Sequence, residues 1–187
     1  MKFVFFIFSL FIGLNTAFSQ ESQNKYLELG LEVQQYPTGF LLGARGEIGL
    51  KTHHAIDFRL GYNVLDHEDF GVHDSEIGGG FGGSVGYRYY FNPEHKNWFV
   101  GARTDLWNNE VDWFDLDPDS GEVIAEGTSN IFVLQPTILG GYRWAINPHL
   151  ALAGTLAAGA EINIVTNGAE IGQGPILLWG LSFTYRW

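Results

Sequence analysis

The sequence PILLWGLSFTYRW, residues 175–187, alternates between two kinds of side chain. From Leu177 to Trp187 every odd-numbered residue is large and apolar, whereas the even-numbered residues after Leu178 are Gly, Ser, Thr and Arg. Successive side chains of a β-strand point to opposite faces, so this period of two predicts a strand with one apolar face and one polar face.

Seven upstream segments repeat the alternation, and helical periodicity is absent after residue 24. The eight predicted strands lie near residues 25–35, 40–51, 55–65, 79–91, 98–107, 131–144, 150–164 and 175–187. Short connections at 52–54, 92–97 and 145–149 alternate with a turn at 36–39 and longer loops at 66–78, 108–130 and 165–174. Short turns at one end and longer loops at the other are typical of membrane barrels. The sequence therefore predicts an all-β, eight-stranded, antiparallel up-and-down transmembrane β-barrel.

Pro136 lies inside the sixth predicted strand, where it cannot donate a hydrogen bond to a neighbouring strand. A closed barrel has no free edge that would accommodate it. We therefore expect a β-bulge at Pro136, which leaves the inward or outward phase of the residues before it open.

The start of the chain has the features of a cleaved secretory signal. A short basic start precedes an apolar run from Phe3 to Leu14, which is shorter than a membrane-spanning helix requires. Small residues then predict cleavage near Ser19-Gln20, so that residues 1–19 are removed and residues 20–187 form the barrel domain. The chain has no Cys, which excludes disulfides and thiolate metal sites, and its net charge of −11 argues against binding to nucleic acid.

The polar face of the predicted strands identifies the interior. It is composed of Gly, Ser, Thr and Asn with a few charges, unlike the Lys-rich exterior of a soluble protein. The apolar face also carries more aromatic residues than an eight-stranded interior easily holds, so it should face lipid. By parity, six carboxylates and all six arginines face inward and should form a lumenal ion network: Glu28, Glu32, Glu47, Asp57, Asp105 and Glu161 with Arg45, Arg59, Arg88, Arg103, Arg143 and Arg186.

Three short motifs close alternate strands: Tyr87-Arg88-Tyr89, Tyr142-Arg143-Trp144 and Tyr185-Arg186-Trp187. In an up-and-down barrel these motifs share one rim, as an aromatic belt would. With its final strand ending on Trp187, the mature chain resembles the small eight-stranded outer-membrane barrels of Gram-negative bacteria, the OmpA/OmpX-like group. The resemblance implies an outer-membrane location, contact with outer-membrane lipid and lipopolysaccharide, and recognition of the last strand by the barrel-assembly machinery. We expect a monomer.

The loops at 66–78 and 108–130 are strongly acidic and contain no Lys or Arg. Within the second loop, Asp115, Asp117, Asp119 and Glu126 have nearly the spacing of a calcium-binding loop, although Gly121 comes one position late and Pro118 interrupts it. The favoured alternative is a hairpin with its turn at 118–121. The acidic residues of these loops have two further interpretations: they form a solvated surface, or they attract cations.

We expect no cofactor other than this possible calcium ion, and no enzymatic activity. His73-Asp74-Ser75 superficially resembles the His-x-Ser pair of outer-membrane lipid A deacylases, but no carboxylate follows at the matching position. The predicted function is an outer-membrane barrel with a largely plugged polar lumen and acidic extracellular loops, acting in envelope integrity, adhesion or surface binding. A narrow porin is the alternative, since many inward positions are glycine, and a lipid A-modifying enzyme is a more distant one.

Overall fold

The computed structural model describes residues 25–68 and 72–187; the expected signal peptide and its cleavage position lie outside these ranges. The described chain consists of eight β-strands, which confirms the expected all-β architecture. They are β1 (Leu27–Tyr36), β2 (Gly39–Lys51), β3 (His54–Glu68), β4 (Ser75–Tyr90), β5 (Asn97–Leu116), β6 (Val123–Ala145), β7 (Leu150–Asn167) and β8 (Gly174–Arg186). Over the described ranges, no helix has the length and apolar character needed to cross a bilayer.

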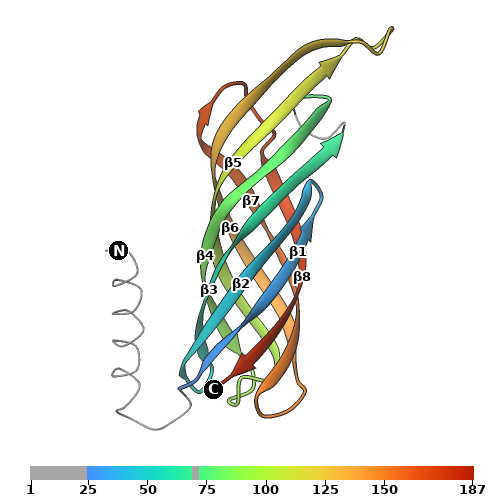
Figure 1. Cartoon of the computed structure of the whole chain (residues 1–187). Coiled ribbons are helices and arrows are strands. Elements are labelled where there is room, and N and C mark those ends of the chain that lie inside the picture. The colour runs from blue at the N-terminus through green and yellow to red at the C-terminus, as the bar shows by residue number, and fades with distance from the viewer. Residues whose placement is uncertain (1–24, 69–71) are drawn as a thin grey trace, which may run out of the picture.

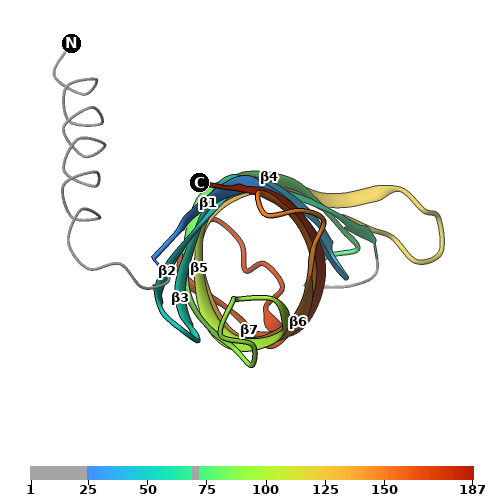
Figure 2. The ribbon, with the colours of Figure 1, turned by 90° about the horizontal axis from the view of Figure 1, so that it is seen from below.

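The strands form one closed barrel in sequence order, and each pairs antiparallel with its neighbours (Figures 1 and 2). Closure is made by β1 and β8, whose register runs from Glu28↔Arg186 to Gln35↔Trp179. The short β2–β3, β4–β5 and β6–β7 turns lie with the C-terminus at the lower end of Figure 1, and the longer connections lie at the upper end.

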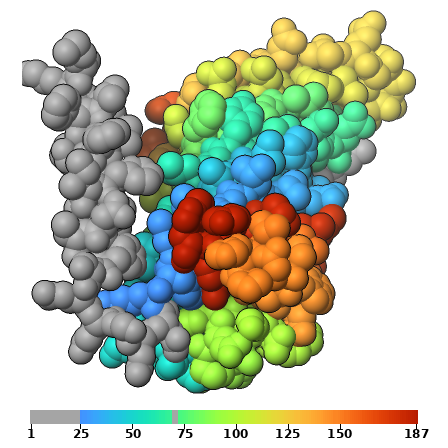
Figure 3. Space-filling model, turned by 60° about the horizontal axis from the view of Figure 1, so that its bottom comes forward, coloured from blue at the N-terminus to red at the C-terminus, as the bar shows by residue number. Residues whose placement is uncertain are grey.

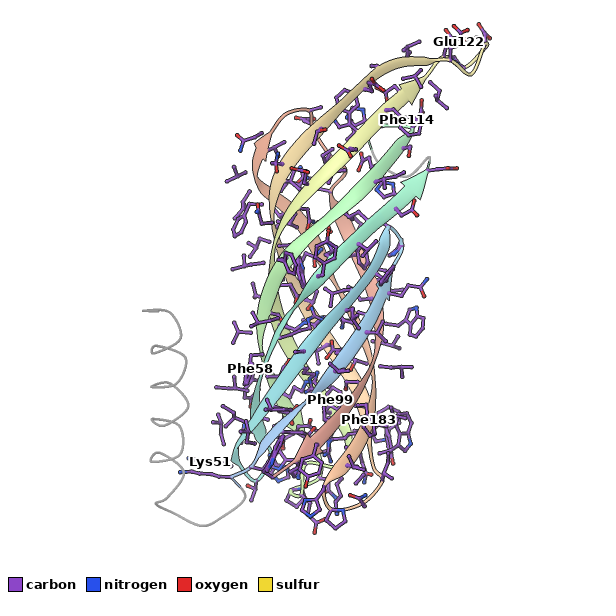
Figure 4. All side chains as sticks on the ribbon, viewed as in Figure 1. Lys51, Phe58, Phe99, Phe114, Glu122 and Phe183 are labelled. Carbon is purple, nitrogen blue, oxygen red and sulfur yellow. The ribbon has the colours of Figure 1, made fainter. Side chains whose placement is uncertain are left out.

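The two faces of the wall have opposite chemistry, as the alternation predicts. The large apolar side chains of Leu60, Phe81 and Ile138 are 71%, 75% and 72% exposed, far more than a water-soluble fold tolerates over a continuous surface. In Figure 4, Phe58 and Phe183 point away from the barrel. Charged and polar side chains point inward and are buried.

Aromatic side chains pack around the outside of the lower end. Tyr142 contacts both Trp98 and Trp144, with ring centroids 5.1 and 4.9 Å apart, and Tyr185 contacts Trp187 at 4.7 Å. These residues include two of the three closing motifs of the sequence, so the structure places those motifs at one rim.

The upper end is dominated by the hairpin of β5 and β6, which projects beyond the rest of the barrel (Figures 1 and 3). Most of the segment 108–130, expected to be a loop, belongs to these two strands, and only residues 117–122 connect them. The expectation of a long loop was therefore wrong, and the hairpin alternative is the one observed. Alternation weakens outside a membrane because both faces meet water, which explains why the pattern does not reveal the strand ends.

Pro136 is accommodated differently from the expectation. The β6–β7 register passes from Leu134↔Ile162 directly to Thr137↔Gly159, so the ladder is interrupted at the proline. The register shift itself lies upstream, between Phe132 and Val133. On the β5 side Pro136 stays in register with Thr104, and β6 keeps one in–out phase through the proline.

Candidate functional site

Glu32 lies at the centre of a buried ion-pair layer in the middle of the lumen. Its carboxylate contacts Arg45 Nε at 3.3 Å, Arg59 Nη1 at 2.8 Å and Arg103 Nη1 at 3.2 Å. Asp105 completes the layer, because it contacts Arg59 at 2.5 Å and Arg103 at 3.2 Å. All five side chains are 3% exposed or less, and they come from four strands, so these contacts cross the lumen.

A second group surrounds Glu47, below this layer. Glu47 pairs with Arg45 and lies 3.6 Å from Arg88. The hydroxyls of Tyr26 and Tyr90 donate to Glu47 Oε1 at 2.5 and 2.8 Å. Arg88 Nε in turn donates to Asp57 at 3.3 Å. The buried carboxylate therefore has both cationic and hydroxyl partners, as burial of a charge requires.

Glu28 gathers the third group at the lower end of the barrel. It accepts from Arg143 Nη2 at 2.7 Å, Arg186 Nε at 3.1 Å and the Thr184 hydroxyl at 2.6 Å. Arg143 also donates to the backbone carbonyl of His95 in the β4–β5 turn at 3.1 Å. These contacts tie a turn to the barrel wall across the lower mouth.

Glu161 is the one predicted lumenal residue that the structure places apart from the arginines. It accepts a hydrogen bond from Gln135 Nε2 at 2.5 Å, and Gln135 Oε1 accepts one from Trp107 Nε1 at 3.1 Å. Trp107, whose position is out of phase for the lipid face, is fully buried and points inward. Its ring lies 5.6 Å from the Arg59 guanidinium, which connects this chain to the central layer.

Glu76 is a further lumenal carboxylate, outside the set of inward charges predicted from the strand alternation. Its Oε1 accepts from the backbone N–H groups of Val72, His73 and Gly172 at 3.2, 3.4 and 3.4 Å, and its Oε2 lies 3.3 Å from His67 Nε2. It thereby joins the β3–β4 and β7–β8 connections over the upper mouth. Glu76 falls in a predicted loop, but extending the parity of β4 upstream would have placed it inward.

His73 braces the root of the projecting hairpin. Its ring stacks on Trp113 at 4.0 Å, its Nδ1 lies 3.1 Å from Asp115, and its Nε2 lies 3.0 Å from the Glu170 carbonyl. Both ring nitrogens therefore contact groups other than Ser75. The contacts of His73 therefore link the β3–β4 connection to the upper part of β5 and to the β7–β8 connection.

The four carboxylates of the calcium hypothesis are not gathered around one point. Asp115 contacts His73, and Asp117 Oδ1 accepts from the N–H groups of Asp119 and Ser120 at 2.9 and 2.8 Å. These turn hydrogen bonds lower the pKa of Asp117. Glu126 is opposite Phe114 in the hairpin register. Within residues 25–68 and 72–187, no group of three or more His, Asp or Glu side chains is arranged to hold a metal ion.

The hairpin presents an unpaired strand edge. On its β5 side, β6 is paired from Leu116↔Val123 onward, with one register shift between Asp115 and Leu116. On its other side, pairing with β7 begins only at Asn130↔Asn167. Residues 123–128 therefore have one edge without a neighbouring strand, and Val123 and Ile124 on it are 54% and 65% exposed. Figure 4 shows Glu122 at the far tip of this hairpin.

Cavities of about 650 Å³ and 510 Å³ lie at the upper and lower mouths of the lumen. The upper one is lined by β3, β4, β6, β7, β8 and the β7–β8 connection, and Figure 2 shows this orange connection within the ring of strands. Arg143 and Arg186 of the Glu28 group line the lower cavity, and the other two ion-pair groups lie between the two cavities.

A closed, eight-stranded, antiparallel barrel with a charged interior and an apolar exterior defines the architecture of the small outer-membrane barrels, and the structural comparisons agree. Neisserial surface protein A has a TM-score of 0.51 with 13% identity, covering 89% of this chain and 98% of its own. A major outer membrane protein from Thermus thermophilus has a TM-score of 0.51 with 15% identity, covering 86% and 99%. The N-terminal β-barrel domain of Pseudomonas aeruginosa OprF has a TM-score of 0.49 with 15% identity, covering 89% and 100%. No protein-family model matches the chain, and no curated protein matches its sequence.

Proposed function

We propose that this chain is an integral outer-membrane protein whose lumen is closed and whose projecting β5–β6 hairpin binds an extended polypeptide. The continuous apolar exterior supports membrane insertion, with outer-membrane lipid, including lipopolysaccharide, around the barrel. The names of the compared proteins, a surface protein and a major outer membrane protein, agree with that location. The short turns then face the periplasm, and the hairpin faces the exterior.

The ion-pair groups support a closed lumen. Glu32, Arg59, Arg103 and Asp105 contact one another from different sides of the wall, and all are buried. A hydrated ion would have to separate charges that compensate each other in a medium of low dielectric. Barrels inserted into planar bilayers should show no conductance steps. Discrete, reproducible conductance steps would favour the narrow porin instead.

The unpaired edge of residues 123–128 is the observation that carries the binding role. Such an edge offers a row of backbone donors and acceptors to a further strand, and natural proteins usually protect or charge it. Here Val123 and Ile124 offer apolar contacts beside it. Residues 108–130 of the hairpin contain seven acidic residues and no Lys or Arg, which favours a strand with basic side chains as the partner.

The direction of each N–H on this edge follows from the strand alternation. Ile146 N–H donates to Leu150 O, so even-numbered residues of β6 direct their N–H toward β7. The register with β5 is uninterrupted from Arg143 to Ala125. The N–H of Glu126 therefore points to the open edge, whereas that of Ala125 points to β5.

This difference gives a matched pair of variants. Glu126→Pro removes an edge donor and should leave the hairpin intact, and Glu126→Thr removes the same charge while keeping the N–H. Extended peptides selected by phage display on the parent barrel in nanodiscs should bind Glu126→Thr and lose binding to Glu126→Pro. Ala125→Pro should disrupt the hairpin itself. Equal binding of the selected peptides to Glu126→Pro would rule out pairing along this edge.

A further inference from the structure

The cavity at the upper mouth of the lumen has two kinds of wall. Leu65, Ile131, Ile171 and Ile176 supply apolar surface, and the first three are 5% exposed or less. Its volume of about 650 Å³ is within the usual range of small-molecule sites. Glu170 and Gln173 at its margin are exposed, so the chamber communicates with the outside solution.

Among the charged or titratable side chains of the described wall, carboxylates outnumber the one histidine, His67. Glu76, Glu161 and Glu170 line the cavity, and no Lys or Arg is among the described residues that line it. Each of the five carboxylates lower in the lumen contacts at least one arginine, whereas Glu161 has only the Gln135 amide as a hydrogen-bond donor in the described chain.

Asn163 provides a second, independent observation: its side-chain oxygen is a buried acceptor with no hydrogen-bond donor among the described residues. Its amide nitrogen donates to the carbonyls of Ile171 and Gly172 at 2.9 and 3.5 Å, which fixes the orientation of the side chain. Its Oδ1 is buried on the cavity wall and accepts no hydrogen bond from the described residues. A buried acceptor without a donor is costly, and an incoming N–H group would satisfy it.

The chemistry of the walls selects among ligands. An anion would meet three carboxylates and no compensating arginine or lysine among the described lining residues. Calcium and magnesium ions take six or more oxygen ligands, and the described residues include no group of three or more His, Asp or Glu side chains arranged to hold a metal ion. An amine with an apolar body matches both the acceptors and the isoleucine surface.

We propose that this cavity binds a small organic amine, with its ammonium group on Glu161 and Asn163 and its apolar part against Leu65, Ile131 and Ile176. The site is independent of the hairpin edge. The hydrogen bonds from Trp107 to Gln135 and from Gln135 to Glu161 connect it to an indole that is fully buried. Occupation of the site therefore changes the environment of the Trp107 indole N–H.

Three probes with the same apolar body and different head groups test the proposal: 2-phenylethylamine, 2-phenylethanol and 3-phenylpropionate. Each is titrated into the ¹⁵N-labelled barrel in micelles, and the Trp107 indole resonance, assigned with Trp107→Phe, is followed by NMR. The amine should give a saturable shift and bind at least tenfold more tightly than the alcohol, whereas the carboxylate should give none.

Glu161→Gln keeps the shape of the side chain and removes its charge. It should weaken amine binding by roughly 10- to 100-fold, the effect of losing one hydrogen bond to a charged group. Glu122→Gln removes the same charge at the hairpin tip and should leave the affinity unchanged. Because the three probes are compared on the parent barrel, the test stands even if Glu161→Gln fails to fold.

Equal affinities for the amine and the alcohol would overturn the proposal. So would the absence of a saturable shift with the amine up to about 10 mM, a concentration well above a weak Kd. An undiminished amine affinity in a folded Glu161→Gln barrel, or an equal loss in Glu122→Gln, would overturn the assignment of the ammonium to Glu161.

Discussion

Glu32→Gln is the sharpest test of the lumenal ion-pair groups, because one carboxylate serves three arginines. In the parent, Glu32 contacts Arg45, Arg59 and Arg103 at 3.3, 2.8 and 3.2 Å, and all four side chains are buried. Glutamine keeps an acceptor oxygen of the same shape, so the change removes charge and little else. Three buried guanidinium groups then share the remaining carboxylates.

The expected destabilisation follows from two opposing effects. Three attractions of about 4 kcal/mol each at an effective dielectric of 20 would sum to about 12 kcal/mol. The variant is spared the several kcal/mol that burial of the Glu32 carboxylate costs. Removal of one partner from a buried ion pair typically costs about 3–5 kcal/mol, and we expect a loss of free energy of unfolding in that range.

Urea unfolding of the barrel in lipid vesicles, followed by tryptophan fluorescence and heat-dependent gel migration, measures this loss. Glu122→Gln at the exposed hairpin tip is the control and should change the free energy of unfolding by less than about 0.5 kcal/mol. A loss below about 1 kcal/mol in Glu32→Gln, the size expected for a solvated surface pair, would show that water screens the lumenal charges. It would refute the inference of a dry, closed lumen.

Three further predictions concern other parts of the barrel. Burial lowers the pKa of His95 in the β4–β5 turn below its ordinary value of about 6.5, because the charged ring is desolvated. The stability that His95 contributes is thus fully present above pH about 6.5 and falls as the pH drops through the folded-state pKa. His95→Gln should flatten this part of the plot of urea unfolding midpoint against pH. An unchanged plot would contradict the role of His95. A Cβ at Gly82 would lie 2.3 Å from the Trp107 ring, whereas one at Gly140 would meet its nearest atom at 3.7 Å. Gly82→Ala should therefore lower the free energy of unfolding in urea by about 1–3 kcal/mol, and Gly140→Ala should leave it almost unchanged. Equal losses in the two variants would count against this packing. Calcium should leave the amide hydrogen exchange rates of the hairpin tip unchanged, because Asp117 already accepts hydrogen bonds from the N–H groups of the turn. Calcium-dependent protection of these amides that Asp117→Asn abolishes would instead support the calcium-site hypothesis.

Parity is sufficient to assign the faces of most strands. The alternation alone places Arg59 and Arg103 inward, and the structure buries both. The same rule fails where a strand is taken to end too early. Glu76 and Asp115 fall in predicted loops, so the pattern does not reveal their roles in holding the upper end together.

The alternation of side chains does not predict which inward charges form ion pairs across the barrel. Glu161 and Glu32 are both predicted to face inward, yet only Glu32 contacts arginines. The difference arises from height along the barrel axis, which depends on the tilt and stagger of eight strands. The partners of Glu32 are far away in sequence, with Arg103 71 residues distant.

The alternation of side chains along the chain is enough to predict the period of two, the number of strands and the side of the wall on which each charge lies, because these depend only on the local geometry of a strand. The folded barrel determines which inward charges meet, since closure of β1 onto β8 sets the stagger that brings distant strands to one height. It also decided that Glu161 faces a cavity and that residues 123–128 have no neighbouring strand on one side. Both features arise where strands of unequal length end at different heights, which a local pattern cannot encode.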